Sequence, residues 1–353
     1  MNKVKKLSFF GETIYCGLDV HKTNWKVNVR TSEMELANFS QDPNANLLNN
    51  YLRRNYPDAE LKVVYEASFC GFEIQRSLTR LGLKCIVVNA ADVPSTDKER
   101  KRKDDKRDAR KLARELSEGN LKGIYIPDKL MEHARSLVRQ RHRLVQDQSR
   151  CKNRIKHLLM FSGVKLPGVE ERWTKKYIAQ IREFNYESMF LKSSVELAIT
   201  EYLNIRNVLN EATRMLRKLS FEPFFEQVQK SLQSIPSIGL INGMVIQTEL
   251  HDMKRFQSLD RLCDYAGLVP DIRSTNDKTT VLGITRRHNE FLREALVESS
   301  WTLIRKDPAM LMKYNDYKKR MNPNKAIIRI GKHLLARIRY VWNNQKQYEI
   351  GLV

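Results

Sequence analysis

The chain has 353 residues, of which 63 are Lys or Arg and 41 are Asp or Glu, so its formal net charge is +22. This charge favours a polyanionic partner, because Lys and Arg neutralise phosphates and release their counterions. The five cysteines contain no Cys-x-x-Cys pair, which argues against a zinc site, and no apolar run approaches the length of a membrane span. We therefore expect a cytoplasmic protein that does not enter membranes and binds nucleic acid.

The first part of the chain alternates strand-like and helix-like segments. Three apolar runs separated by polar turns, TIYCGLDV, WKVNVR and MELANF, predict consecutive strands. Further segments follow in the order helix (44–54), strand (LKVVYE), helix (72–81), strand (KCIVVNA) and helix (105–116). The order β-β-β-α-β-α-β-α predicts an α/β domain with a mixed sheet, and it is the order of the ribonuclease-H-like fold.

Four acidic residues stand at informative places in these segments. Asp19 and Glu66 each follow an apolar strand-like run, and Asp105 and Asp108 are three residues apart, so they share one face of a helix. Two magnesium ions about 3.5–4 Å apart, held by carboxylates, can stabilise both the attacking and the leaving oxygen of a phosphodiester exchange. The four acids together therefore predict a metal site, although each acid taken singly is more typical of a solvated surface residue.

Basic residues cluster at several places. Ten Lys or Arg fall between Lys98 and Arg114, and a second basic segment runs from Arg135 to Lys156. A solvated charged face and a nucleic-acid contact are both compatible with such runs. The residues that we expect to contact nucleic acid are Lys103, Lys106, Arg107, Arg110, Arg139, Arg141, Arg143, Arg273, Lys278, Arg286 and Arg287.

The middle of the chain predicts two long helices, over 131–160 and about 195–219. Apolar residues recur at spacings of three and four in both, as in a coiled coil. The helices could pair with each other or with a second chain, and we favour a dimer seam. Beyond Pro223 the segment SIPSIG is typical of a helix-hairpin-helix element or of a plain helix start, and residues 271–289 read as a polar loop. These shifts predict three domains, 1–127, 128–222 (helical, coiled coil) and 223–353 (mainly α).

Several motifs together resemble one protein family. GLDVHK, YEAS and KDDKRDARKLA are similar to the three signature blocks of the DEDD transposases of the insertion-sequence "one-ten" family, which includes the Piv DNA invertase. The run YAGLVPDIRSTNDKTTVLGITRRHNEFLREAL resembles the second conserved domain of that family. The resemblance covers about residues 13–126 and 230–305.

The resemblance implies a RuvC-like N-terminal domain in which Asp19, Glu66, Asp105 and Asp108 form a DEDD tetrad for two Mg²⁺ ions, with Mn²⁺ as a possible substitute. It also implies a serine nucleophile that links covalently to DNA, and this serine falls on Ser274 of the C-terminal transposase domain. The family continues with two glycines where this chain has Asn276 and Asp277. The implied partners are donor and target DNA, a structured guide (bridge) RNA that pairs with both, and further copies of the chain in a dimer or tetramer.

Three hypotheses follow. The first is a transposase or site-specific recombinase that cuts and rejoins DNA through Ser274 and the metal-binding acids. The second is a RuvC-like nuclease that hydrolyses DNA junctions with metal-activated water, while Ser274 is structural. The third is a non-catalytic nucleic-acid-binding scaffold, for which substitution of the acids would have no effect.

Overall fold

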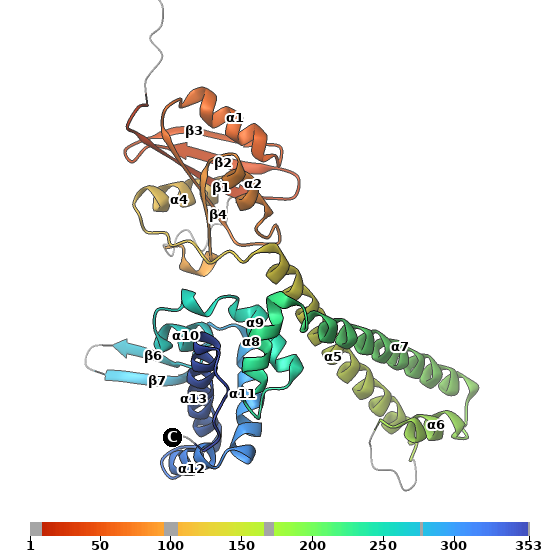
Figure 1. Ribbon diagram of the computed structural model, residues 1–353. Coiled ribbons are helices and arrows are strands. Elements are labelled where there is room, and N and C mark those ends of the chain that lie inside the picture. Colours follow the sequence, from red (N-terminus) through yellow and green to blue (C-terminus); the bar gives the residue numbers. More distant parts are fainter. Residues whose placement is uncertain (1–8, 95–104, 166–172, 276–277, 352–353) are drawn as a thin grey trace, which may run out of the picture. The chain divides into compact units, whose positions relative to one another are not determined.

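The computed structural model describes residues 9–94, 105–165, 173–275 and 278–351; the side chains of 105–107, 273–275 and 278–281 lie outside this description (Figure 1). The chain forms two compact units, Met1–Ile126 and Pro127–Val353. The first unit is a mixed α/β structure and the second is mostly helical, as the sequence predicts. Among the described residues, no helix has both the length and the apolar character needed to cross a bilayer.

The first unit is built on a five-stranded sheet in the order β3-β2-β1-β4-β5. The strands are β1 (Thr13–Val20), β2 (Trp25–Arg30), β3 (Glu35–Gln41), β4 (Glu60–Glu66) and β5 (Lys84–Val88). β1, β2 and β3 pair antiparallel, whereas β4 pairs parallel with both β1 and β5. The predicted order of strands and helices is therefore found, in a mixed sheet whose central strand β1 carries Asp19.

Helices cover both faces of this sheet (Figure 1). α1 (Ala45–Asn55), which starts at the capping side chain of Asn44, and α2 (Glu73–Arg80) pack on the face formed by Ile14, Cys16 and Leu18. α4 (Asp105–Ser117) packs on the other face, where its Leu112 joins a cluster with Val64 and Val88. A short 3₁₀ turn, η1 (Ala90–Asp92), follows β5. The side-chain alternation of β1 thus separates two cores, and Asp19 belongs to the face that α4 covers.

The second unit begins with a long helical hairpin (Figure 1). α5 (Lys129–Phe161) and α7 (Met189–Leu219) run antiparallel: Arg141 Nε donates to Thr213 Oγ1 over 3.0 Å, and Cys151 Sγ donates to the Ala198 carbonyl over 3.4 Å. α6 (Lys175–Glu183) packs near the tip of the hairpin. The predicted seam positions of α7 that are buried are Val195, Ile199, Tyr202, Ala212 and Leu216. The two helices therefore pair within one chain, and these positions need no second protomer to cover them.

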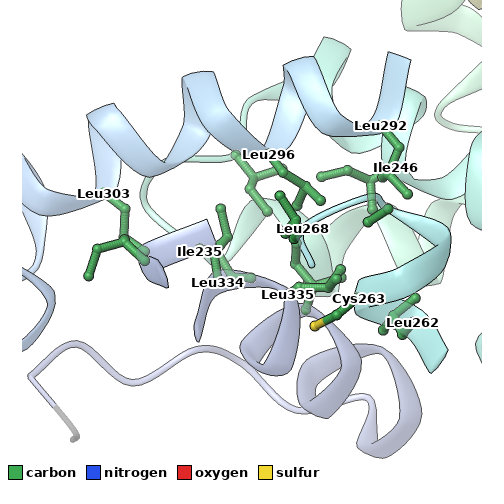
Figure 2. Close-up of a cluster of buried hydrophobic side chains, with 14 of the residues drawn as sticks. Ile235, Ile246, Leu262, Cys263, Leu268, Leu292, Leu296, Leu303, Leu334 and Leu335 are labelled. Carbon is green, nitrogen blue, oxygen red and sulfur yellow. The ribbon is translucent and has the colours of Figure 1, made fainter. Parts of the chain in front are cut away.

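The rest of the second unit packs around one apolar core (Figure 2). Its elements are α8 (Pro223–Gln233), α9 (Leu240–Leu250), η2 (Met253–Arg255), α10 (Leu259–Tyr265), β6 (Pro270–Thr275), β7 (Lys278–Ile284), α11 (Glu290–Lys306), α12 (Pro308–Lys318) and α13 (Pro323–Asn344). Leu268, Leu296 and Leu334 meet in this core. A separate cluster joins the two ends of the hairpin to it: Met131 and Val138 of α5 and Leu216 of α7 pack with Phe225 and Met244.

The expectation of a polar loop over 271–289 is wrong for most of its length. β6 and β7 pair antiparallel there from Pro270↔Ile284 to Thr275↔Lys278. The physical reason is the content of β-branched residues on either side of Asn276 and Asp277, because two such runs separated by two Asn/Asp-type residues form a hairpin. The polar residues Asp271, Arg273, Ser274 and Lys278 concealed this signal, because they make the segment resemble a loop.

Candidate catalytic site

Asp19 and Glu66 stand next to each other at the carboxyl ends of two parallel strands. β1 and β4 are aligned from Thr13↔Glu60 to Leu18↔Tyr65, so extending the register by one residue sets Asp19 beside Glu66. Gly17 is aligned with Val64, two residues earlier on both strands. Because side chains alternate along a strand, both carboxylates project from the face that α4 covers. This register is compatible with the predicted metal site, whose ligands stay a prediction.

A missing side chain lets α4 approach this face closely. A Cβ placed on Gly17 would lie 2.1 Å from the Ala109 carbonyl oxygen and 2.5 Å from the Ala113 amide nitrogen. Both are backbone atoms of α4, so the helix backbone rests directly on β1 at this point. Ala109 and Ala113 are themselves fully buried. Glycine at this strand position therefore sets the distance between the helix and the sheet.

Asp108 lies directly beside this contact, one residue before Ala109, and its side chain is partly exposed. Asp105 opens α4, and its side chain lies outside the described residues. Among the side chains that are described, no group of three or more His, Cys, Asp or Glu is close enough to hold a metal ion. The fold thus sets Asp19 and Glu66 on the sheet face that α4 packs against, and α4 carries Asp105 and Asp108. A shared metal site for the four acids stays a prediction.

His21 is a neighbour of Asp19 that the sequence interpretation missed. Its Nε2 lies 3.0 Å from Asp19 Oδ2, and the Asp19 side chain is 21% exposed. The His21 amide donates to the Asn24 carbonyl over 3.0 Å, which closes the turn after β1 that carries this histidine. His21 is part of the GLDVHK motif. A histidine two residues after an acid that ends a strand is the sequence signal that could have revealed it.

Ser274 lies on β6, paired with Thr279 of β7, and its side chain lies outside the described residues. The base of this hairpin is well defined. Arg293 of α11 donates from Nη2 to the Gly267 carbonyl over 2.8 Å and also to the Thr285 carbonyl. These two carbonyls precede β6 and follow β7, and the Thr285 amide donates to the Val269 carbonyl over 2.9 Å. One guanidinium therefore bridges both ends of the segment that carries Ser274.

Gly267 is adapted to this bridge. It has a φ of +69°, and a Cβ there would lie 2.1 Å from His288 Cβ and 2.4 Å from Arg293 Nη2. A side chain at residue 267 would thus be strained in the backbone and would displace the guanidinium. In the sequence, this glycine indicates no more than the end of a short helix. Its second role depends on contacts with residues more than 20 positions away.

A buried carboxylate connects α5 to the same region. Glu249, which is fully buried on α9, accepts two hydrogen bonds of 2.8 Å from Nε and Nη2 of Arg139. It also accepts one of 2.8 Å from Asn289, whose side chain caps α11 by accepting from the Leu292 amide. The Tyr265 hydroxyl donates to the Glu249 carbonyl over 3.0 Å. This network ties α5, α9, α10 and the start of α11 together.

His251, directly after α9, accepts at Nε2 from Arg135 Nη1 over 2.9 Å. Burial and the nearby guanidinium groups of Arg135, Arg255 and Arg139 lower the pKa of His251 to about 3. The ring is therefore neutral in the folded protein near pH 7. Its backbone has a φ of 61°, which is unusual for a residue other than glycine.

Several of the expected nucleic-acid contacts already have partners within the protein. Arg139 binds Glu249, Arg110 forms an ion pair with Glu35 (2.6 Å, from Nε), and Arg141 is partly buried against Thr213. The hydrogen bond from Arg110 lowers the pKa of the Glu35 carboxyl. Arg143, Arg286 and Arg287 are exposed. Lys103, and the side chains of Lys106, Arg107, Arg273 and Lys278, lie outside the described residues.

Comparison with known families places this geometry in context. Residues 16–162 match a DEDD-type IS110 domain model described as "Transposase", and residues 229–315 match one described as "Transposase IS116/IS110/IS902 family". The chain carries both transposase domains of the IS110 family. The resemblance seen in the motifs is thereby confirmed at the level of the family. The first match extends past the α/β unit into α5, and the second includes the β6–β7 hairpin.

Named relatives agree with the family models. The chain is 31% identical to "Putative transposase y4qE" of Sinorhizobium fredii over 242 residues, which are 67% of this chain and 57% of that protein. It is 24% identical over 304 residues to "Transposase for insertion sequence element IS1533" of Leptospira borgpetersenii, with 82% of this chain and 84% of the relative covered. The chain thus spans little more than half of the first relative and most of the second.

Proposed function

We propose that this IS110-family chain is the transposase of an insertion sequence and acts as a site-specific DNA recombinase. The observation that carries the proposal is the placement of Asp19 and Glu66 side by side on the sheet face that α4, the helix of Asp105 and Asp108, covers. The matches to both transposase domains support it. The strand order β3-β2-β1-β4-β5 supports a RuvC-like, ribonuclease-H-like fold for the first unit.

The donor chemistry of the acids fits a hard divalent cation, because carboxylate oxygens are the ligands that Mg²⁺ and Mn²⁺ prefer. DEDD-type domains are in general metal-dependent, and we propose that Asp19, Glu66, Asp105 and Asp108 hold Mg²⁺. When bound, the metal would offset negative charge on the reacting phosphate. His21 would hold the Asp19 carboxylate in one orientation through the contact to Oδ2.

The proposed nucleophile is the hydroxyl of Ser274. Its oxygen forms a bond to the scissile phosphorus while the bond from phosphorus to one sugar oxygen breaks; the serine proton leaves to a base, and the departing sugar oxygen is released as a hydroxyl. A hydroxyl of the incoming strand then attacks the phosphoserine and restores the serine. The phosphodiester count is unchanged, so no external energy source is required. Arg273, Lys278, Arg286 and Arg287 supply positive charge along the same hairpin and the loop after it.

The partners of this activity are also part of the proposal. Donor and target DNA are the substrates, a structured guide RNA pairs with both, and further protomers complete the assembly. The net charge of +22 supports polyanionic partners in general. Delegating sequence recognition to base pairing would leave the protein to bind backbone shape.

A denaturing gel tests the serine. The wild-type chain, incubated with Mg²⁺ and end-labelled element-junction DNA together with co-purified nucleic acid, is expected to give a protein–DNA adduct that resists denaturation. Ser274→Ala should give none, whereas Ser299→Ala, a serine buried on α11 that takes no part in the reaction, should keep it. Strand exchange at the wild-type rate in Ser274→Ala would refute the assignment.

The same assay separates the alternatives. Hydrolysis by metal-activated water predicts free cleaved ends, no adduct, and loss of cleavage in Asp19→Asn and Glu66→Gln. A non-catalytic scaffold predicts that these acid variants match the wild type in every readout. A recombinase predicts that both acid variants and Ser274→Ala abolish the adduct.

A further inference from the structure

A groove lies between α6 and α7. Its lining residues fall between 175 and 210 in the sequence, apart from the four acids and from the hairpin that carries Ser274. The apolar faces of the two helices meet at Ile178 and Ile181 of α6 and at Val195 and Ile199 of α7. Beside this contact is an open pocket of about 480 Å³. Its polar lining comprises Lys175, Arg182, Glu183, Arg206, Asn207 and Asn210.

The lining has three cations, one carboxylate and two amides. Arg182 already forms an ion pair with Glu196 (2.8 Å), which lies outside the groove lining. For Arg206, no ion pair with an acid occurs in the part of the chain that the structure describes. Asn207 and Asn210 add amide N–H groups that can donate to an oxyanion without adding charge. The groove is therefore suited to an anion that accepts several hydrogen bonds.

Arg206 also belongs to a second group of cations on the hairpin. Lys152 of α5 lies close enough for its charge to interact both with Arg206 and with Lys156, one turn further along α5, and the three side chains are partly buried. Burial, Arg206 and Lys156 together lower the pKa of Lys152, whose Nζ lies 5.8 Å from the centre of the Tyr202 ring. Like charges held together in partly desolvated positions repel each other, and an anion bound between them would relieve this repulsion.

Two adjacent groups of polar and cationic side chains that share one arginine suit a polymer with repeated negative charges. We propose that the α6–α7 groove and the Lys152–Lys156–Arg206 cluster together bind the phosphodiester backbone of a nucleic acid. Successive phosphates would contact Lys175 and the asparagines on one side of Arg206 and the two α5 lysines on the other. This proposal rests on the proposed function only in that the chain must bind nucleic acid. The site takes no part in the bond-breaking step.

The test measures binding by the full-length chain. A fluorescein-labelled DNA duplex and a labelled structured RNA are titrated with wild type, Arg206→Gln, Lys175→Gln and the double variant, over a range of salt concentrations. Each substitution should weaken binding of one or both nucleic acids several-fold, and each lost phosphate contact should reduce the slope of log K against log salt by about 0.9 for duplex DNA. The nucleic acid whose binding is weakened, the DNA duplex or the RNA, identifies the backbone that the site binds.

Arg214→Gln is the matched control, because Arg214 is an exposed arginine of the same helix that pairs with Glu211 of α7. Affinities and salt slopes of the groove variants that equal those of Arg214→Gln would overturn the proposal. So would weakened binding of a labelled poly-glutamate peptide with unchanged binding of both nucleic acids, because the groove would then recognise an acidic protein. The serine adduct assay is independent: its failure in wild type would refute the recombinase function while leaving the binding result intact.

Discussion

The imidazole of His21 lies against the carboxylate of Asp19, with Nε2 3.0 Å from Oδ2. The carboxylate is an acceptor, so Nε2 donates and the contact restricts the rotation of Asp19. Removing an outer partner of a metal-binding group typically lowers metal affinity or activity about 10- to 100-fold. We expect His21→Ala to raise the Mg²⁺ concentration for half-maximal adduct formation by such a factor. His21→Gln, which can still donate to Oδ2, should restore part of it, and equal Mg²⁺ requirements in all three chains would contradict this role.

Gly17→Ala should destabilise the first unit because the new Cβ would meet backbone atoms of α4 at 2.1 and 2.5 Å. Overpacking of this kind costs about 1–3 kcal/mol, and we expect the upper end because backbone atoms cannot rotate away. Urea unfolding followed by tryptophan fluorescence gives the change, since Trp25 is buried in the same sheet. Gly123→Ala is the control: its nearest contact would be the Ile86 Cβ at 3.3 Å. Equal losses in the two variants would show that the close helix approach is not decisive.

Glu249→Gln should lower stability by about 3 kcal/mol, because it leaves Arg139 without its buried carboxylate. We choose the lower end of the range since the Arg139 side chain is 34% exposed. Arg139→Met and the double variant complete a thermodynamic cycle measured in urea. The double variant should lose clearly less stability than the two single losses combined. Strict additivity would mean that the two groups do not stabilise each other.

Arg293→Lys should loosen the base of the serine hairpin, because an ammonium cannot replace the guanidinium Nη2 that donates to both the Gly267 and the Thr285 carbonyls. We expect faster hydrogen exchange of the Thr285 amide and an adduct rate reduced about 10-fold or more, as for misplaced reacting groups. DNA affinity should be unchanged. Arg305→Lys, at an exposed position of the same helix, is the control. Unchanged exchange at Thr285 would argue against the bridge.

Stability should fall as pH decreases from about 6.5 towards 3, in part through His251. The folded pKa is lowered to about 3 from an ordinary value near 6.5, so the unfolded chain binds a proton in this window while the folded chain does not. The stabilisation is therefore present above pH 6.5 and is lost as pH falls. His251→Asn, which does not titrate and tolerates a positive φ, should flatten the dependence between pH 6.5 and 5. Parallel wild-type and variant curves would exclude this contribution.

Local patterns in the sequence predicted much of the fold. The β-β-β-α-β-α-β-α order and the two long helices followed from apolar spacing, because that spacing reflects which face of an element is buried. The β6–β7 hairpin was missed because its residues are polar, although an Asn-Asp pair between two runs with β-branched residues is a hairpin signal in a sequence. The pairing of α5 with α7 was one of two alternatives that spacing could not separate, since a seam has the same pattern whichever chain covers it.

The candidate site was predictable only in part. The sequence places Asp19 and Glu66 near the ends of two strand-like runs, and the parallel register of β1 and β4 sets them next to each other. The Arg139–Glu249 pair joins residues 110 positions apart, and no local pattern connects them. Arg139 instead read as one more cation of a basic helix. Likewise, Gly17 reads as an ordinary small residue until α4 is seen to rest on it.

The α5–α7 hairpin is fixed at one end, where Met131, Val138 and Leu216 enter a shared cluster with Phe225 and Met244. The start of α5 and the end of α7 both belong to this cluster. Insertion or deletion of seven residues in each helix would therefore change the length of the hairpin, here called the arm, without altering the cluster. Such changes would preserve the antiparallel register and shift only the position of α6. The arm can therefore diversify in length during evolution, or be shortened by design, independently of the domains that carry the proposed chemistry.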